Sequence, residues 1–424
     1  MSQTKAGVII TGTEVLTGRI MDRNGPWLSE RLRAQGFEVR HITICRDRAE
    51  DILAQLDFMH REGIDLVCTT GGLGPTADDM TTALVAQFCN REMFLDKPLL
   101  ERIRAIVRPY ADRFGWDLSA LDEGAVKQAH VPREAAVLGP AGTAPGLVVT
   151  PAREDDKPVV VVLPGPPGEL RAIWAEAIET PEFQRVAAGG TVPEEQMLRM
   201  IGVPEPEIAR TLREFEATEG LGGLEVTTCL RGGEMEILIS HGPGEHDRRA
   251  ALVAAFERAY GGAIFSTDGE TVVQQVIRLL AGRKLAVAES CTGGLLAKRM
   301  TDAEGASDFF QGGAVTYSDE AKHELLGVST DLLDQVGAVS AEVAEQMARG
   351  ALERFDADFA VSTTGIAGPT GGSKEKPVGT LYAHVAARDG RSNAVHLVLP
   401  GRRRDVQERA AMVALHALRA LLGA

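Results

Sequence analysis

The sequence predicts an α/β protein of several domains, and three observations lead to this prediction. At 424 residues with 44% hydrophobic content, the chain can form roughly two to four domains with buried cores. Short apolar runs alternate with helical patterns from residue 6 to about residue 180, as in a doubly wound sheet. Several of these runs end in glycine-rich turns, and the loops after parallel strands are where such sheets bind ligands.

The N-terminal part contains two strand-and-turn motifs, with helices predicted over residues 25–35 and 49–61. Residues 8–10 lead into a turn with Glu14, and residues 65–68 lead into a second, glycine-rich turn. Backbone N–H groups of such a turn can bind a phosphate, and two carboxylates can hold a divalent cation against it. Favourable placement in the first turn of the following helix is the other explanation for the carboxylates. The candidate residues of the second turn are Gly71, Gly72, Gly74, Asp78 and Asp79.

From about residue 191 to residue 265 the pattern changes to that of a small α+β module. Helices are predicted over residues 205–216 and 248–260, and an antiparallel strand pair over residues 224–230 and 234–240. There is no GxxG segment with basic neighbours, which favours a connector or dimerisation role over nucleic-acid binding. The nine histidines of the chain, among them His241 and His246, lack the spacing of zinc ligands.

The third region begins near residues 266–269 with a predicted helix over residues 270–280. Next, the apolar residues 284–287 lead into Ala288-Glu289-Ser290-Cys291-Thr292-Gly293-Gly294 and a helical pattern that ends near residue 300. Free N–H groups and the helix dipole at such a point favour negative charge, so Ser290 is a candidate nucleophile in an anion site. The alternative is that Ser290 or Thr292 only caps the helix.

Two further segments of this region are expected to complete the same site. The strand-like run that starts at residue 312 is followed by a polar turn with Tyr317 and Lys322. Residues 358–362 read as a buried strand that leads into a glycine-rich segment with Thr364 and Gly365. Before the last helix stand three consecutive arginines, any of which could bind a phosphate monoester: Arg402, Arg403 and Arg404.

These motifs together resemble the CinA family. The C-terminal motifs resemble its C-terminal domain from about residue 267 onward, and the N-terminal motifs, with residues 142–146 and 164–170, resemble the molybdopterin-binding fold found at the N-terminus of full-length CinA proteins. The resemblance implies a three-layer molybdopterin-binding-like α/β domain over residues 1–175, a small α+β (KH-like) domain over residues 176–265 and an α/β CinA deamidase domain over residues 266–424. Gly139-Pro140 departs from the family, which often has an asparagine there.

For the C-terminal domain, the resemblance implies hydrolysis of the carboxamide of nicotinamide mononucleotide (NMN) to nicotinate mononucleotide and ammonia, without a cofactor. Ser290 would be the nucleophile, with Lys322 or Tyr317 as proton acceptor. Lys322 can act as a base only if its pKa is lowered, and an exposed surface lysine is the alternative. Cys291 is the rival nucleophile, but in an extended segment it would point away from Ser290. The substrate-binding candidates are Thr292, Gly293, Thr364, Gly365 and Arg403.

For the N-terminal domain, the resemblance implies cleavage of ADP-ribose to AMP and ribose 5-phosphate. A divalent metal (Mg²⁺, Co²⁺, Mn²⁺ or Ni²⁺) would be held by Asp78 and Asp79, and K⁺ is a further candidate. A non-catalytic module that binds a nucleotide or a pterin-like ligand is the alternative. The substrate-binding candidates are Gly71, Gly72, Gly74, Glu14 and Asn24.

Charge and cysteine content bear on partners and location. The net charge of −15 argues against a nucleic-acid surface, and therefore against a DNA-damage or competence factor that binds DNA. No apolar run approaches the ~20 residues of a membrane span, and the five scattered cysteines are expected to be reduced thiols. We therefore expect a cytoplasmic homodimer whose partners are the small molecules NMN and ADP-ribose, and neither nucleic acid nor a membrane.

Overall fold

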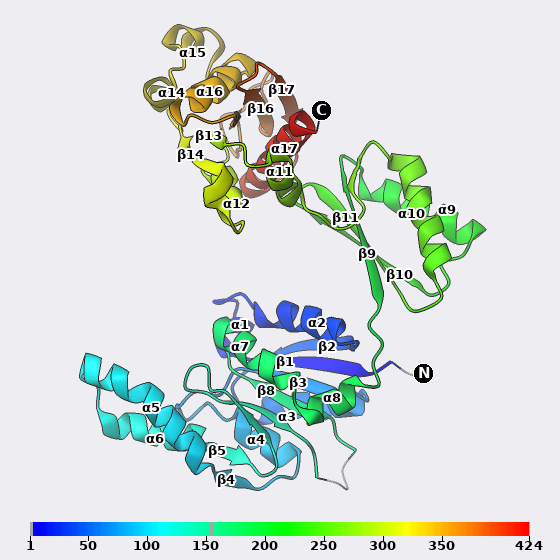
Figure 1. The fold of residues 1–424 in the computed structure, drawn as a ribbon, viewed down its shortest axis with the longest axis vertical. Helices are drawn as coiled ribbons and strands as arrows, with labels where there is room; N and C mark the ends of the chain where they lie inside the picture. The colour runs from blue at the N-terminus through cyan, green and yellow to red at the C-terminus, as the bar shows by residue number, and fades with distance from the viewer. Residues whose placement is uncertain (1–2, 153–155, 424) are drawn as a thin grey trace. The chain divides into compact units, whose positions relative to one another are not determined.

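The computed structural model describes residues 3–152 and 156–423, which form two compact units, Met1–Pro193 and Glu194–Ala424 (Figure 1). Both units contain sheets covered by helices, which confirms the predicted α/β class. No helix in the described ranges is both long and apolar enough to cross a membrane.

The N-terminal unit is built on a six-stranded sheet in the order β2-β1-β3-β8-β7-β6. The first four strands of this order are parallel, and β7 and β6 are antiparallel to their neighbours. The sheet strands are β1 (Lys5–Thr11), β2 (Glu38–Cys45), β3 (Leu66–Thr70), β6 (Ala136–Leu138), β7 (Gly146–Val149) and β8 (Val159–Leu163). The helices are α1 (Thr13–Leu16), α2 (Asn24–Ala34), α3 (Ala49–Arg61), α4 (Thr81–Phe88), α5 (Lys97–Phe114), α6 (Leu118–Gln128), α7 (Pro167–Ala177) and α8 (Pro181–Ala187).

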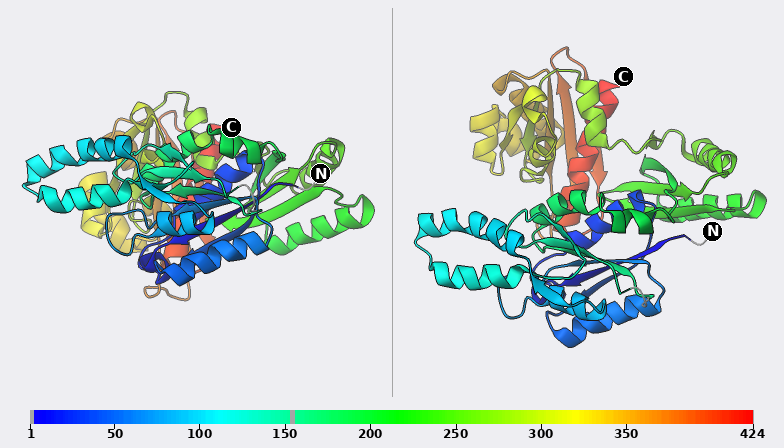
Figure 2. Two further views of the ribbon diagram at one scale, coloured as in Figure 1. Left: turned by 90° about the horizontal axis from the view of Figure 1, so that it is seen from below. Right: turned by 60° about the horizontal axis from the view of Figure 1, so that its bottom comes forward.

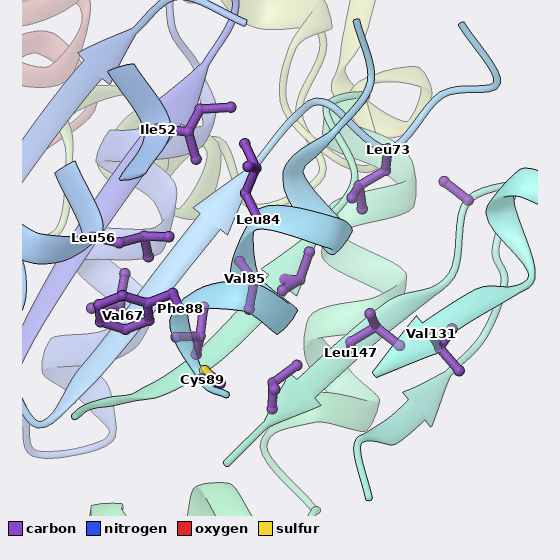
Figure 3. Packing of buried hydrophobic residues seen from close by; sticks show 14 of the residues in the cluster. Ile52, Leu56, Val67, Leu73, Leu84, Val85, Phe88, Cys89, Val131 and Leu147 are labelled. Atoms are coloured by element: carbon purple, nitrogen blue, oxygen red, sulfur yellow. The ribbon is translucent and has the colours of Figure 1, made fainter. Parts of the chain in front are cut away.

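The central strands are apolar on both faces because helices cover both faces of the sheet. On one face, Val67 of β3 packs with Leu84, Val85 and Phe88 of α4 (Figure 3). On the other face, alternate residues of the same strands pack in a second core cluster with α2, α7 and α8. This arrangement is the three-layer α/β domain that the sequence predicts.

Two additions modify the predicted N-terminal domain. Helices α5 and α6 form a hairpin that projects from the sheet domain, next to the two-stranded sheet of β4 (Met93–Leu95) and β5 (His130–Pro132) (Figures 1 and 2). At the other end, α8 belongs to the N-terminal core, because Phe183 is buried against Phe37 and Trp174. The predicted boundary at residue 175 is therefore too early, and the N-terminal unit extends to Pro193.

The first part of the C-terminal unit is a four-stranded antiparallel sheet in the order β10-β11-β9-β12, covered by two helices. Its predicted hairpin is confirmed, with Arg231 paired to Glu234 at the turn. The elements are β9 (Glu194–Ile201), α9 (Glu205–Thr218), β10 (Leu224–Arg231), β11 (Glu234–His241), α10 (His246–Tyr260) and β12 (Ile264–Ser266).

The second part of the C-terminal unit is a five-stranded sheet in the order β14-β13-β15-β16-β17. Strands β14, β13 and β15 are parallel, whereas β16 and β17 continue the sheet in antiparallel fashion. One core cluster lies between the sheet and α11, α12 and α17, and another includes α14, α15 and α16. The elements are α11 (Val272–Leu280), β13 (Leu285–Glu289), α12 (Leu295–Thr301), α13 (Ala306–Phe309), β14 (Phe310–Val315), α14 (Asp319–Leu326), α15 (Thr330–Val336), α16 (Ala341–Arg354), β15 (Phe359–Gly365), β16 (Thr380–Ala387), β17 (Ser392–Val398) and α17 (Arg403–Leu422).

Candidate functional site

The C-terminal unit has a cavity at the carboxyl edge of its three parallel strands. The chain runs from β13 to β14 on one side and later to β15 on the other, so the strand order reverses at β13. Such a reversal leaves a crevice beyond the strand ends. The cavity there has a volume of about 160 Å³, and the structure brings six predicted site residues into its lining. The lining residues are Ser290, Cys291, Tyr317, Lys322, Ala338, Val339, Thr364, Gly365, Ala367 and Arg403.

The loop that carries Ser290 is held by the carboxylate of Glu289, the last residue of β13. Glu289 is fully buried and accepts hydrogen bonds from the N–H groups of Gly294 (3.0 Å), Leu296 (3.0 Å) and Ala297 (2.7 Å). These are the N–H groups that a helix start leaves unpaired. The capping role considered for Ser290 and Thr292 is therefore wrong. Sequence reasoning missed Glu289, although a carboxylate just before a Gly-Gly helix start was a usable signal.

Thr292 and Gly293 do not line the cavity. The Thr292 hydroxyl is buried and lies 2.7 Å from the hydroxyl of Thr363, so it links the loop to the end of β15. Gly293 and Gly294 have φ of 63° and 97°, a left-handed conformation that glycine adopts without steric cost. The structure thus places both predicted binding residues where they shape the loop.

Ser290 and Cys291 both line the cavity, because they lie in a turn and not in an extended segment. The expectation that Cys291 points away is therefore wrong. Burial raises the pKa of the Cys291 thiol to about 12, so the thiol is protonated at neutral pH. A side chain at Gly365 would also collide with its surroundings, since a Cβ there would lie 3.2 Å from the Cys291 sulfur and 2.4 Å from the Thr380 carbonyl. This packing leaves Ser290 as the better-suited nucleophile.

Lys322 is buried at the cavity wall, with only 1% of its side chain exposed. Its Nζ donates to the carbonyl oxygens of Thr316 (3.1 Å), Tyr317 (3.3 Å) and Ser318 (3.4 Å). Burial lowers the pKa of Lys322, and the carboxylate of Asp319, 3.8 Å away, acts in the opposite direction. The alternative of an exposed surface lysine is wrong for this residue.

Tyr317 and Arg403 form the outer wall of the cavity. Arg403, the first residue of α17, donates from Nη2 to the Tyr317 hydroxyl (3.2 Å) and from Nη1 to the Gly368 carbonyl (3.0 Å). Tyr317 is 64% exposed, so this pair faces solvent. Of the three consecutive arginines only Arg403 lines the cavity, and Arg404 instead pairs with Glu408 (3.1 Å).

The N-terminal unit has a second polar cluster at the carboxyl edge of β1, β3 and β8. Asn24 is buried and donates to the Thr70 hydroxyl (3.0 Å) and the Gly165 carbonyl (2.8 Å). Both amide N–H donors of Asn24 are thereby used, which leaves only its oxygen for a ligand. Glu14 is exposed in α1, directly after β1.

The three glycines of the second N-terminal turn differ in what they offer a ligand. The Gly71 N–H donates to the Leu163 carbonyl (3.1 Å), so it is not available to a phosphate. The N–H groups of Gly72 and Gly74 make no hydrogen bond within the described ranges. A Cβ at Gly74 would lie 2.4 Å from an oxygen of Asp79, so a side chain there would displace the Asp79 carboxylate.

Asp78 and Asp79 lie in the turn before α4, which begins only at Thr81. The expectation that they occupy the first turn of this helix is wrong, and helix-dipole placement does not explain them. The Thr76 hydroxyl lies 2.5 Å from Asp78 Oδ1 and 2.6 Å from Asp79 Oδ2. One hydroxyl proton can serve only one of these oxygens. The hydrogen bond from Thr76 lowers the pKa of Asp78 and keeps it ionised.

This all-oxygen donor set fits a hard divalent cation. In the described parts of the chain, no third histidine, cysteine, aspartate or glutamate joins this pair within ligand distance. Mg²⁺ is commonly bound by one or two carboxylates together with substrate phosphates, so a pair is sufficient for such a site.

Comparison with known proteins gives matches to two family models and to full-length relatives. The model described as "CinA C-terminal domain" matches residues 269–422, and the one described as "Probable molybdopterin binding domain" matches residues 7–184. "CinA-like protein" of Mycobacterium avium (strain 104) is 51% identical over 431 residues, covering 99% of this chain and 98% of that protein. "CinA-like protein" of Mycobacterium marinum is 50% identical, covering 99% of this chain and 98% of that protein.

Among solved structures, a similar one is that of competence/damage inducible protein CihA from Agrobacterium tumefaciens. It is 41% identical, covers 35% of this chain and 94% of that chain, and has a TM-score of 0.34.

Proposed function

Because the chain belongs to the CinA family, we propose that its C-terminal cavity is the active site of an amide hydrolase that deamidates NMN. The observation that carries the proposal is the convergence of Ser290, Lys322 and Arg403 on one cavity. A serine hydroxyl needs a base to become a nucleophile, and a buried lysine with a lowered pKa can be that base.

The size of the cavity suits one ring of the substrate. A cavity of roughly 150 Å³ is sufficient for a benzene-sized molecule, and this one has about 160 Å³. The nicotinamide ring would therefore enter the cavity, and the ribose and phosphate would remain at its rim. There the Arg403 guanidinium uses two of its five N–H donors on Gly368 and Tyr317, which leaves three for a phosphate.

The reaction would follow the usual order of acyl transfer. Ser290 Oγ attacks the carboxamide carbon and gives its proton to neutral Lys322, directly or through Tyr317. The C–N bond then breaks, ammonia leaves with a proton from Lys322, and a nicotinoyl ester of Ser290 remains. Water hydrolyses this ester, which releases nicotinate mononucleotide and restores the serine. The carbonyls of Thr316, Tyr317 and Ser318 keep Lys322 Nζ at the cavity wall, where the neutral amine can donate to two of them and the protonated amine to all three.

For the N-terminal unit we propose a second activity, the metal-dependent cleavage of ADP-ribose to AMP and ribose 5-phosphate. The supporting observation is that Asp78 and Asp79 converge on Thr76, with Asp79 beside Gly74, in the turn where the N–H groups of Gly72 and Gly74 are unpaired within the described ranges. Asp78 and Asp79 would hold the divalent cation, whose chemistry is to neutralise phosphate charge and to activate water. The alternative remains a module that binds a nucleotide or a pterin-like ligand without turnover.

Product analysis with NMN and ADP-ribose, each with and without EDTA, tests both proposals. We expect ammonia and nicotinate mononucleotide from NMN in both conditions, and AMP from ADP-ribose only without EDTA. Absence of ammonia from NMN would refute the deamidase proposal. If ADP-ribose binds but AMP is not released with Mg²⁺, Mn²⁺, Co²⁺ or Ni²⁺ in the presence of K⁺, the binding-module alternative is correct.

A further inference from the structure

Two histidines and a glutamate converge in the four-stranded sheet, away from both sites described above. Glu194 is the first residue of β9 and His241 the last residue of β11, and the antiparallel register places them directly opposite each other. His246 is the first residue of α10. One carboxylate oxygen and one nitrogen from each imidazole all lie within 4.8 Å of one another. Among the described residues this is the one group of three or more such side chains that meets this distance.

The environment of His241 points to a ligand for its second nitrogen. The His241 side chain is only 2% exposed, and its Nδ1 lies 2.9 Å from the Gly242 carbonyl. A carbonyl only accepts hydrogen bonds, so Nδ1 carries the ring proton and Nε2 presents a lone pair. Within the described ranges, Nε2 is buried and has no hydrogen-bond partner. An unpaired buried nitrogen is costly, and a metal ion would satisfy it.

The pattern matches the way proteins orient metal-binding histidines. A ligating imidazole usually donates its other N–H to a carbonyl or carboxylate, which fixes the tautomer and the ring orientation. His241 already makes this bond to Gly242. His246 and Glu194 are both exposed and can adjust to a metal, and the His246 ring packs edge-on against that of His241, with centroids 5.3 Å apart.

The spacing of the outer two ligands also suits a tetrahedral ion. Two ligands about 2.0–2.1 Å from a metal at the tetrahedral angle are about 3.3–3.4 Å apart. His246 Nδ1 and Glu194 Oε2 are 3.4 Å apart. We propose that Glu194, His241 and His246 form a site for Zn²⁺ or a similar imidazole-preferring transition metal, with the fourth position open to water.

The proposed metal would join three separate elements of the antiparallel sheet module. It would tie the first residue of the C-terminal unit, Glu194, to the end of β11 and the start of α10. A ligand that binds only the folded state raises stability in proportion to its affinity. This inference is independent of the proposed hydrolase activities, because none of the three residues belongs to either of those sites.

Metal titration of the full-length chain without a polyhistidine tag tests the proposal. A background with Asp78→Asn, Asp79→Asn and Cys229→Ser removes the other candidate carboxylate site and the exposed thiol. Zn²⁺ affinity is measured by competition with a chromophoric chelator, and ligand geometry by the visible absorption of bound Co²⁺. We expect one Zn²⁺ per chain and Co²⁺ absorption typical of low coordination number.

The variants His246→Ala and Glu194→Gln decide the outcome. Both residues are exposed, so neither change threatens folding. Since loss of a supporting group alone costs about 10–100-fold in metal affinity, loss of a ligand should weaken Zn²⁺ binding by about a hundredfold or more and abolish the Co²⁺ bands. His41→Ala is the matched control, because His41 also lies near one carboxylate, Glu62 at 3.6 Å. Absence of Zn²⁺ binding in the background, or equal affinity in all variants, would overturn the proposal.

Discussion

The two strand-edge sites of this protein share a topology but differ in where their charged groups lie. In the C-terminal unit, Glu289 and Lys322 are buried, so their electrostatic interactions are strong and their positions fixed. In the N-terminal unit, Asp78 is exposed to solvent and hydrogen-bonds only within its own turn. Under the two proposed activities, the same position in an α/β fold, the carboxyl edge of parallel strands, would serve two chemistries. In the C-terminal unit the buried side chains would react with the substrate directly, whereas in the N-terminal unit the exposed carboxylates would act on a phosphate through a bound cation.

The largest expected effect is on the nucleophile of the C-terminal site. Ser290→Ala should lower kcat for NMN deamidation by at least ~10³-fold, because the covalent route is lost. AMP release from ADP-ribose should be unchanged, since that site lies in the other unit. Cys291→Ala is the matched control and should retain most deamidase activity, as its thiol is protonated and packed against Gly365. The reverse ranking of the two variants would assign the nucleophile to Cys291.

The reciprocal change tests the N-terminal site. The double variant Asp78→Asn, Asp79→Asn should lower metal-dependent AMP release on the order of 10²–10³-fold, because neutral amides cannot hold a hard cation against a pyrophosphate. NMN deamidation by the same preparation should stay at the wild-type rate and serves as the folding control. A double variant that still releases AMP at the wild-type rate would exclude these two carboxylates as metal ligands.

A smaller effect is expected for the base. Lys322→Met should lower kcat by roughly 10²-fold with little change in KM, in line with general-base catalysis. A lysine base works only when neutral, and burial places its pKa below the ordinary 10.5. The wild-type rate should therefore rise with pH through this lowered pKa and level off above it, and the variant should lack that rise. If Lys322→Met keeps the pH profile of the wild type, Lys322 is not the base and Tyr317 is the remaining candidate. Tyr317→Phe would then test that assignment.

The next effect concerns binding at the rim of the cavity. Arg403→Ala should raise KM roughly ten- to a hundredfold for NMN, but far less for nicotinamide riboside, which lacks the phosphate. Arg404→Ala is the matched control, because Arg404 pairs with Glu408 and does not line the cavity. Equal increases for both substrates would indicate structural damage at the start of α17 instead of a lost phosphate contact.

The sequence predicted the strand-and-turn motifs and their meeting at one sheet edge, because the carboxyl ends of parallel strands always share an edge. It did not predict the burial of Lys322, which depends on how α14 packs on the rest of the domain. The start of α4 was placed too early because Asp78 and Asp79 bond to Thr76 and hold a turn. The sequence did not predict the cluster around His241, because the register of β9 and β11 brings its members together from distant parts of the chain.

The smallest expected effect is on stability, and it tests the contribution of the buried Glu289 carboxylate. Glu289→Gln removes the charge and one acceptor from a carboxylate that pairs three N–H groups, so it should lower the free energy of unfolding of the C-terminal unit by about 1.5–3 kcal/mol. All three tryptophans, Trp27, Trp116 and Trp174, lie in the N-terminal unit, so their fluorescence follows that unit alone.

Glu289→Gln should therefore lose deamidase activity at a lower urea concentration than the wild type. The urea concentration at which the tryptophan fluorescence changes should stay the same. Asp78→Asn is the counterpart in the other unit and should move neither transition, because water already solvates that carboxylate. If Glu289→Gln loses deamidase activity at the same urea concentration as the wild type, the loop before α12 is held by its glycines and its packing and not by the Glu289 carboxylate. The contrast between a buried C-terminal site and an exposed N-terminal site would then lose its main support. If Asp78→Asn moves the tryptophan transition, the N-terminal turn contributes to folding, and its carboxylates cannot be assigned to ligand binding alone.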